Sequence, residues 1–173
     1  MVVNITKTLL HALDQVRALG NRKHVALELD CPAALPQTRG RPLQLDRLLR
    51  ALLTHAIKVS SRGKAIQVFA VATLHGVDGT SDSVAVVVAD TGPAMGRREF
   101  DRVLGAFHPS SVLQMQGVLR GAPLLSLTCR LGRLEGGRLW VKSKAGHGTI
   151  LAAVLPVARP RRGAVAVPQG REP

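Results

Sequence analysis

The chain has 173 residues, of which 46% are hydrophobic and 2% aromatic, and it carries a formal net charge of +13. This length predicts one domain with an aliphatic core, and the scarcity of aromatic side chains argues against a base-stacking surface for single-stranded nucleic acid. The Arg and Lys residues are dispersed along the chain, which is more typical of a solvated surface than of a nucleic-acid footprint.

The first residues carry no signal-peptide pattern, and no apolar run reaches the roughly 20 residues of a membrane helix. Cys31 and Cys129 lie far apart in the sequence without metal-ligand spacing. They indicate a reduced compartment, although two cysteines also allow one bridge. We therefore expect a cytoplasmic location, for this chain by itself or as the cytosolic part of a larger protein.

The first part of the chain shows helix and strand signals in turn. Residues 4–20 have apolar side chains at helical spacing, with Asn4 as the expected N-cap and Gly20 as the expected stop. Residues 24–30 alternate apolar and polar positions, which predicts a half-buried strand. After a loop rich in Pro and Gly, residues 43–60 repeat Leu and Ala at the spacing of an amphipathic helix.

The second part predicts strand pairs separated by helices. In chain order we expect a strand pair over 65–74 and 83–90, a short helix over 97–107, a flexible loop over 107–119, a helix over 123–137 and a second hairpin over 138–157. The order of elements predicts an α+β domain over residues 1–157, with a mixed sheet of about five strands and helices on one face. Residues 158–173 are rich in Pro, Gly and Arg and predict a disordered tail.

Three segments carry a family resemblance: RALLTHAIKVS, ADTGPAMG and LGRLEGGRLWVKSKAGHGTILAAVLP, in that order. Together they resemble the catalytic, ATP-binding domain of sensor histidine kinases, a branch of the GHKL ATPases. The resemblance extends from Asn4 to Val157. Its most specific part is the closing block, in which a glycine pair, an RLWV strand, a GHGT turn and a strand ending in Leu-Pro follow one another. It implies the two-layer α/β sandwich of the GHKL type.

The resemblance assigns adenine recognition to the end of the strand over 83–90. In the family, the Asp of an Asp-x-Gly-x-Gly motif accepts a hydrogen bond from the exocyclic amine of adenine, which makes Asp90 the adenine-reading residue. A carboxylate can make a charge-assisted bond of this kind in a half-dry pocket. Gly92 would leave room for the base, and Thr149 matches the threonine that supports it. Asp and Gly also suit an ordinary turn, but the neighbouring matches favour the ligand-binding interpretation.

The helix motif that holds the phosphates and the metal in this family departs from its pattern. The family sequence Asn-x-x-x-Asn-Ala-x-Lys reads Ala51, His55, Ala56 and Lys58 here. Alanine cannot bind a metal, and imidazole suits a hard cation poorly, so His55 is a weak metal candidate. His55 can equally be a surface or capped histidine, and Lys58 a solvated helix lysine rather than a phosphate ligand.

The glycine-rich lid of the family is also altered. Its Gly-x-Gly-Leu-Gly-Leu segment reads Gly121, Ala122, Pro123, Leu124 and Leu125 here. Only Gly121 keeps its match among the lid glycines, and the proline has no amide hydrogen to offer a phosphate. The second glycine of the Asp-x-Gly-x-Gly motif is also replaced, because Ala94 stands in its position.

The resemblance and its departures imply a degenerate ATP-binding domain of a sensor histidine kinase. It would act in two-component signal transduction as a pseudokinase that docks on partner proteins, with weak or lost phosphotransfer. We expect weak binding of ATP or ADP, and the sequence leaves magnesium binding undecided. The implied partners are a response regulator or a kinase helical-hairpin domain, and a homodimer would form through a region upstream of this domain.

Two alternatives stay open. The first is an active histidine kinase ATPase domain with an unusual metal and phosphate site, in which His55 helps to hold the metal. The second is a basic nucleic-acid-binding module that uses the Arg-rich tail, and it predicts binding that weakens steeply with salt.

Overall fold

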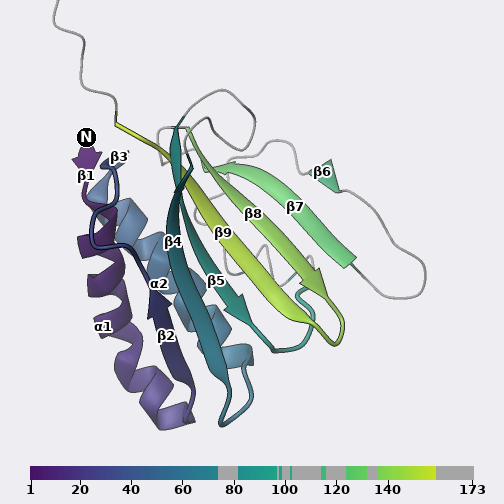
Figure 1. Cartoon of the computed structure of the whole chain (residues 1–173). Coiled ribbons are helices and arrows are strands. Elements are labelled where there is room, and N and C mark those ends of the chain that lie inside the picture. Colours follow the sequence, from purple (N-terminus) through teal and green to yellow (C-terminus); the bar gives the residue numbers. More distant parts are fainter. Residues whose placement is uncertain are drawn as a thin grey trace, which may run out of the picture.

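The computed structural model describes most of the chain, in the ranges 1–73, 82–96, 98, 102, 114–115, 124–131 and 136–158. Two helices, α1 (Ile5–Lys23) and α2 (Pro42–Val59), lie against one face of a seven-stranded sheet (Figure 1). The predicted α+β sandwich with helices on one face is therefore confirmed.

The sheet is mixed, and its strands follow the order β2-β4-β5-β9-β8-β7-β6. Its strands are β2 (Ala26–Asp30), β4 (Ala65–Thr73), β5 (Ser83–Asp90), β6 (Gln114–Met115), β7 (Leu124–Leu131), β8 (Gly137–Lys144) and β9 (Gly148–Pro156). Strands β2 and β4 are parallel, and the other described neighbours pair antiparallel. A separate two-stranded sheet, β1 (Val2–Val3) with β3 (Thr38–Arg39), lies beside the start of the helices.

Helix α1 begins as predicted but ends later. The Asn4 side chain accepts a hydrogen bond from the backbone amide of Lys7 at 3.0 Å, which confirms it as the N-cap. The predicted stop at Gly20 is wrong, because the helix continues to Lys23 and ends at His24, which has a left-handed conformation (φ 56°). Gly20 is instead needed for close packing, since a Cβ atom there would lie 3.2 Å from the carbonyl oxygen of Val25.

Helix α2 is the centre of the hydrophobic core, as its sequence predicts. Pro42 occupies the first turn, where the missing amide hydrogen costs nothing. The helix buries an apolar stripe completely, formed by Leu45, Leu48, Leu49, Leu52, Leu53, Ala56 and Ile57. These side chains pack in one cluster with the inward-facing residues of β4, β5, β8 and β9. Both predicted hairpins, β4–β5 and β8–β9, are confirmed.

The helix predicted over 123–137 is wrong. Residues 124–131 form strand β7, which pairs antiparallel with β8 from Leu124↔Lys144 to Leu131↔Gly137. The sequence of this segment contains a period of two that favours a strand, with Leu125, Leu127 and Cys129 alternating with polar positions. Gly136 (φ 93°) therefore lies in a turn directly before β8 and does not end a helix.

Other predictions fall partly or wholly outside the described residues. The short helix over 97–107 is described only at Arg98 and Arg102, which are helical, and the tail beyond residue 158 is not described. Within the loop predicted over 107–119, Gln114–Met115 form the short strand β6 beside β7, so that pair does not belong to a loop. Cys31 has a free thiol, which removes the predicted alternative of a bridge. In the part of the chain that the structure describes, neither helix is long and apolar enough to span a bilayer.

Candidate functional site

Asp90 is the last residue of β5, and its carboxylate is buried at the point where the strand turns into a loop. Only 4% of its surface is exposed. Its Oδ1 atom accepts a hydrogen bond from the backbone amide of Gly92 at 2.8 Å, so one carboxylate oxygen closes an Asx-type turn. The structure therefore shows the ordinary turn role of Asp90, and this turn holds the carboxylate in a fixed orientation.

Two hydroxyl groups continue the row that starts at Asp90. The sheet register pairs Asp90 with Thr149 on β9, and Thr149 with Ser143 on β8. Both hydroxyl residues are buried, and their oxygen atoms lie 2.7 Å apart. The Ser143 hydroxyl also accepts a hydrogen bond at 2.7 Å from the backbone amide of Met95, in the segment after Asp90. The network thus joins the ends of three strands to this segment.

Sequence reasoning assigned Asp90 and Thr149 to the site but missed Ser143 and Met95. A signal for Ser143 is present in the sequence, because it follows Leu139 and Val141 on the inward face of β8, where a polar residue is unusual. Met95 has no such signal, since its contribution is a backbone amide.

Gly148 lets β9 begin directly beside Asp90. Its φ angle is 80°, and a Cβ atom there would overlap the carbonyl oxygen of Asp90 and lie 2.8 Å from the carbonyl carbon. Gly146, in the same turn, also has a positive φ (75°), but a Cβ atom added to it would meet no other atom within 4 Å. The two glycines therefore serve different purposes: Gly146 permits the turn, and Gly148 permits the close approach of two strands.

Gly92 joins the Asp90 turn to the end of helix α2. A Cβ atom at this position would lie 2.8 Å from the carbonyl oxygen of Val59 and 2.9 Å from its Cγ2 atom. The sequence predicts room for a base beside Gly92, but on this side the space is taken by Val59. The glycine lets the turn that follows Asp90 lie against Val59, the last residue of α2.

Lys58 has an exposed side chain at the end of α2. Its backbone carbonyl accepts a hydrogen bond from the Nζ atom of Lys23, the last residue of α1. A lysine near a helix C-terminus also interacts favourably with the helix dipole. The position of Lys58 therefore suits a phosphate contact and an ordinary solvated lysine equally.

The two positions that would hold a metal in the resembled family are part of the helix packing. Ala51 is partly buried and packs against the hydrophobic core. His55 is only 5% exposed, so the interpretation of a surface histidine is wrong. Among the described residues, no three His, Cys, Asp or Glu side chains gather as metal ligands would. Magnesium, which prefers carboxylate, amide and water oxygens, does not fit this pair of side chains.

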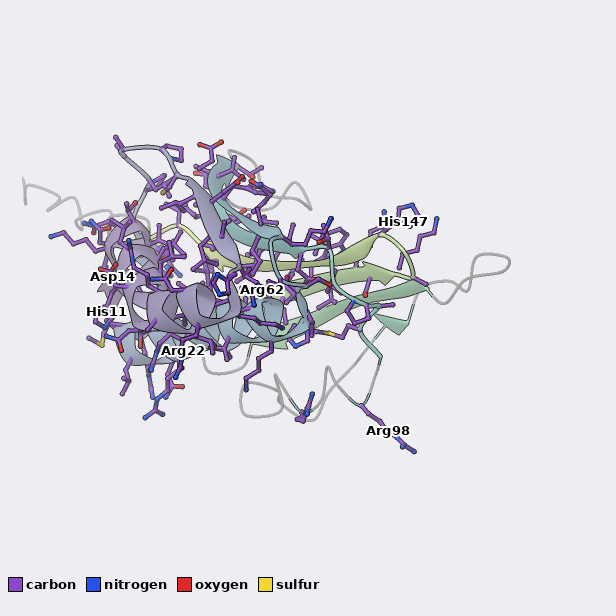
Figure 2. All side chains as sticks on the ribbon, turned by 90° about the horizontal axis from the view of Figure 1, so that it is seen from below. His11, Asp14, Arg22, Arg62, Arg98 and His147 are labelled. Atoms are coloured by element: carbon purple, nitrogen blue, oxygen red, sulfur yellow. The ribbon has the colours of Figure 1, made fainter. Side chains whose placement is uncertain are left out.

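Gly121, Ala94 and His147 belong to the other motif positions that carry the resemblance. Gly121, the predicted lid glycine, lies outside the described residues. Ala94 is half-buried in the segment between Gly92 and Met95. His147 lies at the tip of the β8–β9 turn, on the opposite side of the molecule from His11 and Asp14 of α1 (Figure 2).

Comparison with known proteins identifies the family of the chain. Residues 40–159 match the family described as histidine kinase-, DNA gyrase B-, and HSP90-like ATPase. Adaptive-response sensory kinase SasA of Synechococcus sp. (strain JA-3-3Ab) is 32% identical over 138 residues, which are 79% of this chain and 34% of that protein. Histidine protein kinase DivJ of Caulobacter vibrioides is 31% identical over 114 residues, 65% of this chain and 18% of that protein. The chain thus spans about a third or less of the length of these curated relatives.

Solved structures show the same fold. The mycobacterial sensor histidine kinase MprB superposes with a TM-score of 0.56 at 20% identity, covering 92% of this chain and 99% of that one. Histidine kinase ThkA, in complex with response regulator protein TrrA, superposes with a TM-score of 0.62 at 12% identity, covering 91% of this chain and 42% of that one.

Proposed function

Because this chain belongs to the family of histidine kinase-, DNA gyrase B- and HSP90-like ATPases, we propose that it is an adenine-nucleotide-binding domain of two-component signalling with weak or lost phosphotransfer. In this proposal the adenine half of the pocket is kept and the phosphate half has lost its metal ligands. The observation that carries the proposal is the contrast between the Asp90–Thr149–Ser143 row and the packed positions Ala51 and His55.

The row at the strand ends supports adenine recognition. The Asp90 carboxylate is fixed by its own turn, and Thr149 beside it is fixed by Ser143. A ligand meeting this row therefore finds acceptor oxygens in set positions, and little conformational entropy is lost on binding. An exocyclic amine is a donor that a carboxylate binds with a charge-assisted hydrogen bond. Asp90 and Thr149 are the residues that would hold adenine.

Helix α2 supports the loss of phosphotransfer. Phosphoryl transfer depends on metal ions and on positioning, since the protein does little covalent chemistry itself. Neither Ala51 nor the buried His55 supplies an oxygen ligand. We therefore assign no step to magnesium. Such a domain acts by docking, and the partner classes that we propose are a response regulator and a kinase helical-hairpin domain, as the complex of ThkA with a response regulator illustrates for a relative of the same fold.

One observation favours the second candidate, an active kinase domain with an unusual phosphate site. Lys58 is exposed in the last turn of α2, next to the Asp90 turn through the contact of Val59 with Gly92. A lysine there can reach an anionic group that extends from the pocket. The nucleic-acid alternative has no comparable support, since its Arg-rich tail lies outside the described residues.

Titration calorimetry with ADP and ATP, with and without magnesium, tests the proposal. We expect both nucleotides to bind weakly and with the same affinity when magnesium is absent or present. Asp90→Asn should weaken ADP binding by roughly tenfold or more, because a hydrogen bond to a charged group is lost. Asp14→Asn, which removes an exposed carboxylate paired with Arg17, is the matched control and should leave binding unchanged.

Two results would contradict the proposal. Tight ATP binding that requires magnesium would show a working phosphate site and favour the active-kinase candidate. Binding of ADP that is indifferent to Asp90→Asn would remove the adenine assignment, provided that the variant unfolds at the same denaturant concentration as the unchanged protein.

A further inference from the structure

The sheet is apolar on both of its faces. Residues that alternate along β4, β5 and β9 point inward to the helices and belong to the core, as Val68, Val86 and Leu151 do. Most of the residues between them are also apolar and point away from α1 and α2, whereas Gln67 on β4 is polar. We call this second surface the open face, and it consists of Phe69, Val71, Ala85, Val87, Ala89, Trp140, Ile150, Ala152 and Val154.

The open face is exposed at three of its side chains, whereas Val87 and Ala152 between them are only 8% and 7% exposed. Phe69 is 38% exposed, Val71 45% and Ile150 37%. No described helix lies over this surface, and Figure 1 shows it turned toward the viewer with α2 behind the sheet. An antiparallel sheet with one solvated face normally alternates apolar and polar residues, so a second apolar face indicates a surface that is covered in the functioning protein.

Opposite charges flank the open face. Glu28 and Asp30 project from β2 at one edge, in the rows of Gln67 and Phe69. Lys142 and Arg138 project from β8 on the other side, in the rows of Ile150 and Val154. Glu28 and Lys142 belong to the same row of the sheet, which runs Glu28, Gln67, Ala89, Ile150, Lys142. The face therefore has an acidic side, an apolar centre and a basic side.

We propose that the open face binds the open face of a second copy of this chain. A two-fold axis parallel to β5 reverses the order of the strands, so β2 of one copy lies over β8 of the other. Glu28 then faces Lys142 of the second copy, and Val71 faces Val154 of the second copy. The apolar centres meet in an aligned sheet-on-sheet packing, which is the arrangement that natural β-sandwiches use to bury two such faces.

The charge pattern favours a second copy over other occupants. The charged groups of a nucleic acid are all phosphates, and the acidic side of the face would repel them. The carboxylates of Glu28 and Asp30 would also repel a strongly acidic protein surface. A face with acid and base on opposite sides is complementary to itself after a two-fold rotation, and this complementarity sets the register of the two sheets.

Sedimentation equilibrium of the full chain without nucleotide tests the proposal independently of the proposed function. We expect a concentration-dependent dimer. Val71→Lys should weaken dimerisation by roughly tenfold or more, because it places an unpaired charge at the apolar centre. Leu43→Lys is the matched control: Leu43 is a 58% exposed apolar residue at the start of α2, away from the open face, and its change should leave the dimer intact.

A charge swap distinguishes this dimer from any other. Glu28→Lys and Lys142→Glu should each weaken the dimer, because each brings like charges together across the two-fold axis. The double variant should restore it, since the pair is then reversed in both copies. A monomeric chain at high concentration would overturn the proposal, and so would a dimer that Leu43→Lys disrupts while Val71→Lys and the charge variants do not.

Discussion

The strand-end row and helix α2 meet at the same site but hold their residues in different ways. Asp90, Thr149 and Ser143 are neighbours across three strands, so the ladder of backbone hydrogen bonds sets their spacing. Ala51 and His55 lie on a helix whose buried stripe forms the core. A polar row set by sheet register is therefore kept together by the fold itself, whereas ligand positions on a core helix can be filled by any residues that pack well.

Separating the strands that form the strand-end row should lower the stability of the protein the most. Gly148→Ala should lower the free energy of unfolding by about 3 kcal/mol or more, because the methyl group meets the Asp90 carbonyl in a left-handed backbone conformation. Gly146→Ala shares the positive φ but has open space, so it should cost only about 1 kcal/mol. Urea denaturation of both variants measures the difference, and equal losses would show that the close approach is unimportant.

The contact between the Asp90 turn and helix α2 should have the second-largest effect on stability. Gly92→Ala should cost about 2 kcal/mol, because the added methyl group forces the turn away from the carbonyl of Val59. Gly96→Ala is the control, since no atom lies within 4 Å of its added methyl group, and its effect should stay within about 0.5 kcal/mol. Thermal unfolding followed by circular dichroism suffices. A variant at Gly92 as stable as the control would mean that the turn and α2 are not in firm contact.

Removing a side-chain hydrogen bond within the strand-end row should lower the free energy of unfolding by a smaller amount. Ser143→Ala should cost about 1 to 2 kcal/mol, since the Met95 amide and the Thr149 hydroxyl lose a buried partner. Thr149→Val removes the same hydroxyl pair from the other side. A double-mutant cycle measured by chemical denaturation should therefore show that the losses are less than additive. Strict additivity would indicate that the two hydroxyls do not interact.

The smallest effect is expected for a substitution on helix α2, measured as a change in nucleotide affinity. Lys58→Met should change the affinity for ADP and for ATP by less than about threefold, because an exposed charge acting without a metal contributes little. Lys64→Met, in the loop that follows α2, controls for the general loss of positive charge. A large loss that is specific to ATP and to Lys58 would instead favour the active-kinase candidate, and the contrast between the two regions would no longer hold.

Much of the fold could be predicted because its signals are local. The period of 3.6 in α1 and α2, the Asn4 cap and the alternation in both hairpins depend on residues close together in the chain. The errors have physical reasons. Gly20 suggested a helix stop, but tight packing against Val25 requires it inside the helix. Residues 124–131 suggested a helix, but pairing with β8 makes them a strand.

Local patterns in the amino-acid sequence were enough to establish the α+β class, the central helix and the residues that carry the family resemblance, because these depend on periodicity and on short motifs. The folded chain was needed to show that Ser143 holds Thr149, that Gly148 clears the backbone of Asp90 and that Gly92 clears Val59. The folded chain was also needed to show that Glu28 and Lys142 share one row of the open face. These are contacts between segments far apart in the chain, and only the register of the sheet and the packing of α2 bring them together.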